Sequence, residues 1–273
     1  MLSELNPPLK IFNKSNAIVF GGYWSGEIMI VNLQQKQPNQ IETLYQNPEK
    51  SKVTCIEIDS FDTFLACGTE IGFVFVYQIQ QTDQHKITLD KYRTLSEHKH
   101  QIVDIVITNK LNLLVSLSIN GYVAVYTFPA LKLINLFFVH ENVSNCVISS
   151  CPLPCYVFLV NHKQSLKSYS INGQFLNEIE VKGEVTEVKV AKDVEFSEYL
   201  LCGTKTLNGH CEIQILNLPY LEKDSNLKKI VFESELRCMD LAEDHSFMML
   251  VLQKLNDDKP ELIMIRENKN ETI

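Results

Sequence analysis

The sequence has no long apolar run, and none of its segments approaches the roughly 20 residues that a membrane-spanning helix needs. The first ten residues, MLSELNPPLK, also lack the apolar segment of a secretory signal peptide. Apolar residues occur instead in short stretches along all 273 positions. These absences predict a cytoplasmic chain that inserts no segment directly into a membrane.

Positive charge is scarce as well. Lys and Arg number 25 against 33 Asp and Glu, which gives a formal net charge of −8. An acidic chain is repelled by a phosphate backbone, so we predict no nucleic-acid partner. The Phe-Arg-Arg-Gly loop motif of phosphoinositide-binding propellers is absent, and the only local basic run is Lys228–Lys229. A site for lipid headgroups is therefore disfavoured too.

Catalytic motifs are also missing. The sequence lacks a nucleophile elbow, a phosphate-binding loop, a metal-binding pair of His and carboxylates, and a cysteine with an obvious base. The one close cysteine pair, Cys151 and Cys155, has a spacing that fits no standard zinc site. We expect no enzymatic activity, no metal and no cofactor. The scattered acidic residues are expected to be solvated or to lie in turns: Asp62, Asp104, Glu187, Glu195 and Asp240.

No long helical pattern is present, and short β-rich runs take its place. The clearest group lies between Leu95 and Tyr126, where the apolar runs are Ile102–Ile107, Leu113–Leu117 and Tyr122–Tyr126. A polar break and the turn Ile119-Asn120-Gly121 separate these runs, which predicts an antiparallel meander. The runs are apolar at consecutive positions, as expected for strands covered on both faces in a propeller blade.

The same pattern recurs along the chain with a period of roughly 40 to 50 residues. We therefore predict an all-β fold, a WD40-type β-propeller with about six blades present. The second repeat is expected to have its outer strand at Tyr92–Leu95, after a solvated connection at Gln78–Lys91. The predicted repeats cover residues 9–45, 53–95, 102–138, 143–181, 185–233 and 236–265.

The two terminal repeats raise the question of how the ring closes. The sixth repeat lacks a predicted outer strand, and only Met1–Pro8 precede the first strand. Because propellers avoid open sheet edges by closing the ring, we expect a seven-bladed ring with one blade upstream. The alternative is a six-bladed ring closed by Met1–Ser3. In the first case the terminal repeats are expected to expose apolar side chains: Ile28, Ile30, Met248, Leu250, Ile263 and Met264.

A buried polar set is typical of WD repeats. An ideal repeat joins a His, a turn Asp, a Ser or Thr and a Trp by hydrogen bonds, and this set ties one blade together. In the second repeat Ile71 and Tyr77 replace the Asp and the Trp, so the set is absent there. In the third repeat it is eroded, and we expect its members to be structural rather than catalytic: His98, Ser116, Asn120 and Tyr126.

Several segments resemble, in the same order, the C-terminal propeller of BEACH-domain proteins, the neurobeachin and lysosomal-trafficking-regulator group. They are FGGYWSGEIMIV, KVTCIEID, HKHQIVDIVITNKLNLLVSLSINGYVAVYTF, SYSINGQFLNEIEV, LLCGT and LRCMDLAEDHSFMMLVL. The chain departs from the family pattern at Ser25, where Asp is frequent, and in losing most Gly-His pairs. The resemblance implies a longer parent chain with an upstream BEACH domain. It also implies a cytoplasmic location peripheral to endosomal or lysosomal membranes, through that parent.

The leading functional hypothesis is a non-catalytic scaffold that binds other proteins in vesicle- or lysosome-related trafficking. A generic WD40 adaptor in another cytosolic complex is the alternative, and a propeller enzyme is a weaker one because fold does not fix function. Trp24, the only tryptophan, follows Tyr23 in a predicted turn. This pair is a candidate partner-binding site, since Trp and Tyr dominate interface hot spots. Packing of Trp24 against a neighbouring blade is the competing interpretation.

Overall fold

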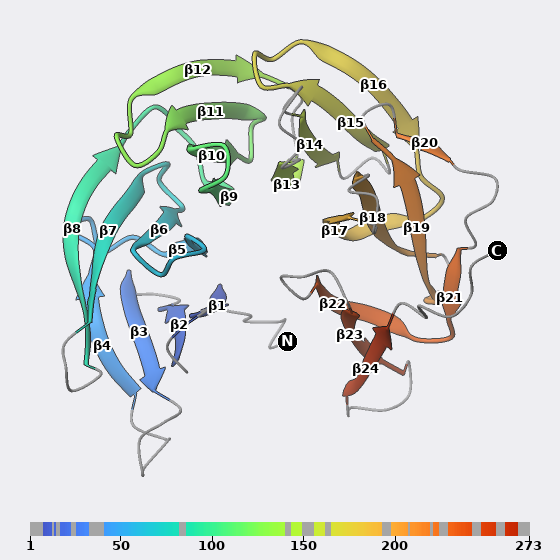
Figure 1. The fold of residues 1–273 in the computed structure, drawn as a ribbon, viewed down its shortest axis with the longest axis horizontal. Coiled ribbons are helices and arrows are strands. Elements are labelled where there is room, and N and C mark those ends of the chain that lie inside the picture. The colour runs from blue at the N-terminus through green and yellow to red at the C-terminus, as the bar shows by residue number, and fades with distance from the viewer. Residues whose placement is uncertain are drawn as a thin grey trace. The chain divides into compact units, whose positions relative to one another are not determined.

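The computed structural model consists of β-strands joined by turns and loops, and the described residues contain no helix (Figure 1). The structure describes residues 8–12, 14, 17–22, 26–32, 41–81, 86–139, 143–148, 156–161, 165–192, 198–206, 208–218, 221–223, 229–241, 247–254 and 260–266. The chain divides into two compact units, Met1–Ser144 and Asn145–Ile273. Each unit is built from consecutive antiparallel sheets, as the meander pattern predicts.

The first unit contains three four-stranded sheets, each made of strands that follow one another in the chain. The first sheet comprises β1 Leu9–Ile11, β2 Ala17–Gly21, β3 Glu27–Asn32 and β4 Ile41–Gln46. The second comprises β5 Val53–Ile58, β6 Phe64–Thr69, β7 Val74–Gln81 and β8 Ile87–Leu95. The third comprises β9 Ile102–Thr108, β10 Leu113–Ser118, β11 Tyr122–Thr127 and β12 Leu133–Phe138.

The second unit follows the same rule, and the boundary between the units falls within β13. Its first sheet comprises β13 Val143–Ile148, β14 Tyr156–Asn161, β15 Ser165–Ser170 and β16 Phe175–Glu180. The next comprises β17 Glu184–Lys192, β18 Glu198–Lys205, β19 Cys211–Asn217, β20 Glu222–Lys223 and β21 Ile230–Phe232. The last comprises β22 Glu235–Leu241, β23 Phe247–Gln253 and β24 Pro260–Arg266.

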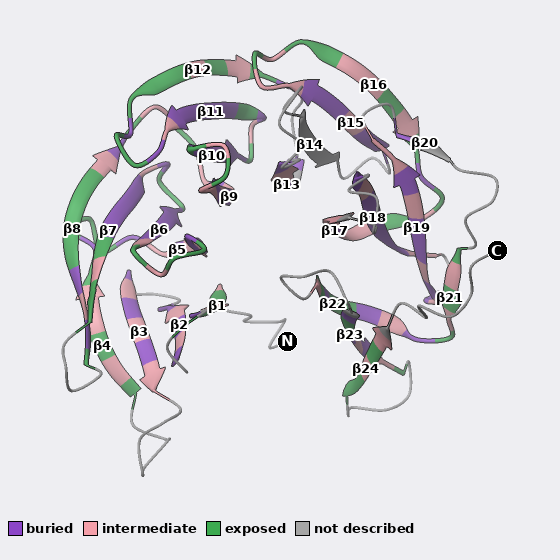
Figure 2. Cartoon of the chain, in the orientation of Figure 1, coloured by how far each residue is buried: buried purple, intermediate pink, exposed green. Residues whose placement is uncertain are grey.

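The core of each unit lies between successive sheets. The middle strands β10 and β11 are almost entirely buried, whereas the outer strands β4, β12 and β16 alternate between exposed and half-buried positions (Figure 2). Three outer strands carry acidic residues, while β12, with the sequence LINLFF, contains no charged residue. Burial on both faces explains the continuous apolar runs of the inner strands.

Two glycines of the first unit allow neighbouring sheets to approach closely. A Cβ atom on Gly21 of β2 would lie 2.8 Å from the Cβ atom of Val53, the first residue of β5. A Cβ atom on Gly68 of β6 would lie 2.7 Å from the Cβ atom of Ile102, the first residue of β9. Gly203 of β18 meets Leu236 of β22 in the same way within the second unit. Glycine is therefore required where the next sheet begins.

A buried carboxylate joins two turns at the other ends of these strands. Asp59 is fully buried in the β5–β6 turn and accepts hydrogen bonds from the backbone N–H groups of Thr63 at 2.7 Å and Phe64 at 2.6 Å. Its Oδ2 atom accepts a further bond from Nδ2 of Asn109, in the β9–β10 turn, at 3.0 Å. Asn109 in turn accepts from Ser60. These bonds tie the second sheet to the third.

The predicted connection Gln78–Lys91 is wrong over most of its length. Residues 78–81 extend β7, and β8 begins at Ile87 rather than at Tyr92. Ile87 and Leu89 are buried in the core shared with the first sheet, while Asp90 and Lys91 face solvent. The start of the strand was missed because only Ile87 and Leu89 mark it, in a segment otherwise rich in Gln, Asp and Lys. Strand β20 was not predicted either.

The predicted exposure of the terminal sheets is wrong for most of the named residues. Ile28, Ile30, Met248 and Leu250 are buried, because alternation along β3 and β23 turns them toward the neighbouring sheet of their own unit. Ile263 is half-buried, and Met264 is exposed as expected. The apolar side chains on the opposite faces include Leu9, Ile11, Met249 and Leu262.

We predict that Gly68→Ala lowers the free energy of unfolding by about 1–3 kcal/mol, because the new methyl group collides with Ile102 Cβ, which the backbone holds in place. Gly203→Ala is the matched comparison. Its nearest neighbour is the end of the flexible Leu236 side chain, which can rotate away, so we expect a smaller loss. Urea denaturation of both variants measures the difference, and equal losses would contradict this account of the close approach.

We predict that Asp59→Ala costs about 2–4 kcal/mol, because it leaves the donors of Thr63, Phe64 and Asn109 without their acceptor. Asp90→Ala serves as the control, since Asp90 is exposed on β8 and its loss should change stability by less than about 0.5 kcal/mol. Thermal and urea unfolding would test both. Similar stabilities for the two variants would show that the turn-to-turn bonds contribute little.

Candidate functional site

The third sheet carries the polar residues that the WD pattern singles out. His98 lies in the loop between β8 and β9, is 6% exposed, and places its Nε2 atom 2.7 Å from Oγ of Ser116, on β10. The hydroxyl of Tyr126, on β11, donates to Oε2 of Glu97 at 2.7 Å. The structure thus brings His98, Ser116 and Tyr126 to one side of the sheet, with Glu97 beside them.

The fourth member of the predicted set makes a different bond. Asn120, in the β10–β11 turn, accepts from Oγ of Ser118 at 2.7 Å. His98 Nδ1 is buried and has no hydrogen-bond partner among the described residues. Sequence reasoning missed Glu97, although it occupies the position where an ideal repeat has Gly directly before the His. The sequence signal for this pair is Tyr126 in place of Trp, because a buried tyrosine hydroxyl needs a hydrogen-bond acceptor.

Burial fixes the protonation of this set. It lowers the pKa of His98 to about 4, an effect that the negative charge of Glu97 partly opposes. Burial also raises the pKa of Tyr126, and its hydrogen bond to Glu97 raises it further. At neutral pH the imidazole is therefore uncharged and the phenol protonated. Both groups act as hydrogen-bonding parts of the sheet rather than as an acid and a base.

A cavity of about 390 Å³ opens next to this set. The β6–β7 turn forms a neighbouring edge, where Gly72 has a φ of 94° and a Cβ atom would lie 2.8 Å from the carbonyl oxygen of His98. On the other side, the backbone N–H of Ile119 donates to Gln101 O at 2.9 Å. The cavity is lined by Glu97, His98, Lys99, His100, Ser118, Asn120, Tyr122 and Leu136.

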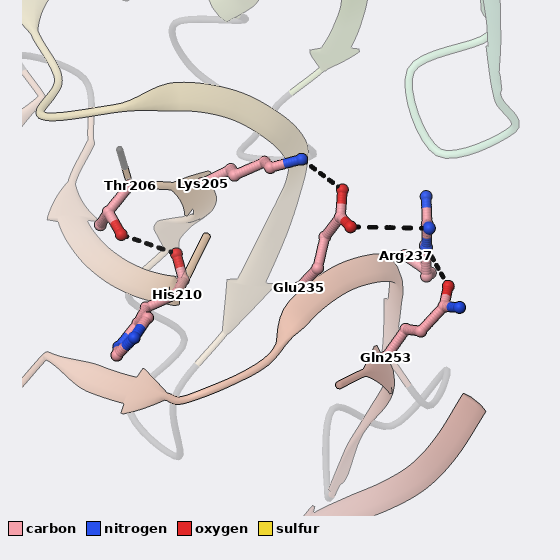
Figure 3. Close-up of polar contacts among 6 residues, drawn as sticks. All are labelled: Lys205, Thr206, His210, Glu235, Arg237 and Gln253. Atoms are coloured by element: carbon pink, nitrogen blue, oxygen red, sulfur yellow. Dashed lines mark hydrogen bonds and ion pairs between the residues drawn. The ribbon is translucent and has the colours of Figure 1, made fainter. Parts of the chain in front are cut away.

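An ionic network lies in the second unit, where β22 begins (Figure 3). Lys205, at the end of β18, pairs with Glu235 at 2.6 Å, and Arg237 lies 3.5 Å from the other oxygen of the same carboxylate. Arg237 Nε also donates to Oε1 of Gln253, on β23, at 2.7 Å. The bond to Lys205 is the main cause that lowers the pKa of Glu235. This network joins two sheets of the unit and is structural.

Tyr23, Trp24, Cys151, Cys155 and Glu195 lie outside the described residues.

Three of the remaining acids have separate partners. Asp62 accepts from the backbone N–H of Lys14, Asp104 from Ile105, and Asp240 pairs with Lys189 at 3.3 Å. Within the described ranges no group of three or more His, Cys, Asp or Glu is placed to hold a metal ion. The same ranges include no helix of sufficient length and apolarity to cross a membrane.

We predict that His98→Gln reduces the pH dependence of stability. The pKa of His98 falls from its ordinary value near 6.5 to about 4 on folding, so its contribution is complete above about pH 6.5 and is lost as the pH falls toward 4. The wild-type protein should lose on the order of 2 kcal/mol more than the variant between pH 7.5 and 5. Urea denaturation at both pH values tests this, and parallel losses would contradict it.

Comparison with known proteins identifies the fold. No family model matches the sequence, and no curated protein sequence matches it. The structure is similar to a chain in the crystal structure of the mitotic checkpoint complex, with a TM-score of 0.71 and 13% identity, over 96% of this chain and 79% of that chain. It is also similar to the computationally designed Ika8 protein, with a TM-score of 0.66 and 17% identity, over 95% and 70% of the two chains. The chain is an all-β protein with a β-propeller fold.

Proposed function

We propose that the chain is a non-catalytic scaffold that binds other proteins. The supporting observation is an exposed surface on the first unit, here named the loop surface. It consists of Ile71, residues 97–101, Ile119, Tyr122, Leu136 and Phe138. Contacts of Gly72 with the His98 carbonyl and of Ile119 with Gln101 make it continuous.

The composition of the loop surface supports binding of a protein rather than catalysis. Its five large apolar side chains are between 37% and 52% exposed, and the Tyr122 and Phe138 rings lie 5.5 Å apart. Clustered exposed apolar side chains mark interaction sites, and tyrosine is enriched among the residues that dominate binding energy. One structural neighbour also belongs to a protein complex.

The finer proposal concerns the place of the chain in the cell. The ordered resemblance to the C-terminal propeller of BEACH-domain proteins supports a role in vesicle- or lysosome-related trafficking, as part of a longer parent chain with an upstream BEACH domain. In that setting the propeller is cytoplasmic and reaches endosomal or lysosomal membranes through its parent. A generic WD40 adaptor in another complex remains the alternative.

Affinity capture with quantitative mass spectrometry tests the scaffold function. The bait is the full chain, compared with a variant carrying Ile71→Ser and Tyr122→Ser, and we expect this variant to lose at least one co-purifying protein by about tenfold or more. The control carries Ile41→Ser and Tyr92→Ser, which change two exposed side chains on the outer strands β4 and β8. Retention of every co-purifying protein by the loop-surface variant would contradict the proposal.

A further inference from the structure

The cavity in the loop surface has a built interior. Two of its lining residues, Ser118 and His98, are more than nine-tenths buried. Ser118 holds the β10–β11 turn through Asn120, and its Oγ atom also lies 3.1 Å from the carbonyl oxygen of Tyr122. The Nδ1 atom of His98 is left without a partner among the described residues. The cavity therefore has a polar floor held in place by hydrogen bonds, and its volume of about 390 Å³ is typical of ligand sites.

The charges around the cavity are arranged to favour an anionic group. Lys99 and His100 are exposed at the cavity, and neither forms an ion pair within the part of the chain that the structure describes. Among the described residues of the lining Glu97 is the only acidic one, and its carboxylate accepts the hydroxyl of Tyr126, which is 1% exposed. One carboxylate is thus engaged with the sheet interior, while a lysine and a histidine remain available.

The remaining wall of the cavity is apolar. Tyr122 and Leu136 are each 41% exposed and lie on the adjacent strands β11 and β12. The Tyr122 ring contacts the Phe138 ring, which continues the apolar wall beyond the cavity. A ligand that fills this site needs an acidic group for the lysine side and an apolar group for the tyrosine side.

We propose that this cavity binds a partner protein through a peptide segment in which an Asp or Glu stands next to a large apolar residue. The carboxylate lies beside Lys99 and His100, where charge-assisted hydrogen bonds are available. The apolar side chain packs on Tyr122 and Leu136, and its burial supplies the larger part of the affinity. This inference rests on the scaffold function and specifies the chemistry of the partner.

Selection of a phage-displayed random peptide library on the full chain tests the inference. We expect enriched peptides to share an acidic residue adjacent to Leu, Ile, Met or Phe. Synthetic fluorescent copies of these peptides should then bind at least tenfold more weakly to Lys99→Glu and to Tyr122→Ala. Lys132→Glu and Tyr92→Ala are matched controls, because Lys132 is exposed in the loop between β11 and β12 and Tyr92 is an exposed tyrosine that also contacts a phenylalanine ring.

Three outcomes would overturn the inference. The library gives no enriched peptide, the enriched peptides lack the acidic–apolar pair, or their binding is unaffected by Lys99→Glu and Tyr122→Ala. Each of these leaves the affinity capture free to succeed through another part of the loop surface. Failure of the scaffold proposal gives a different result: the affinity capture then yields no protein whose binding depends on Ile71 and Tyr122.

Discussion

The close approach of one sheet to the first strand of the next is the constraint on which the architecture depends. At Gly21 and Gly68, the space that a side chain would occupy is filled by the Cβ atoms of Val53 and Ile102. A sheet can pack this tightly against the next one only if its own strand β2 or β6 has no side chain at the point of contact. Because neighbouring sheets approach so closely, each of the apolar clusters contains residues from two of them.

Polar groups then fix how the turns meet. Asp59 collects donors from its own turn and from Asn109 in the next sheet, and the Lys205–Glu235–Arg237 network performs a similar task in the second unit. The His98–Ser116 bond holds a loop onto the interior of the third sheet instead. A satisfied buried group such as Asp59 specifies one arrangement among many apolar ones, because any alternative leaves a donor or acceptor unpaired.

Much of the fold could be predicted from the sequence because the inner strands are buried on both faces, and their apolar runs begin and end at clear turn residues. The start of β8 could not, since only Ile87 and Leu89 mark it among polar neighbours. The burial of Ile28 and Met248 depends on which face of a strand meets the next sheet, and a continuous apolar run does not encode this. The pairing of Glu97 with Tyr126 and the cavity both depend on where the loop between β8 and β9 lies in space. The local sequence pattern does not predict that position.

The uncharged outer strand β12 has a consequence for the chain before it folds. Its six residues, LINLFF, combine high β propensity with no charge and no proline, which is the composition of segments that stack into cross-β fibrils. The outer strands β4, β8 and β16 each contain an acidic residue, whose charge opposes such stacking. In the folded sheet β11 pairs with one edge of this hexapeptide, whereas both of its edges are unpaired before the third sheet forms, so stacking is most favoured over that interval.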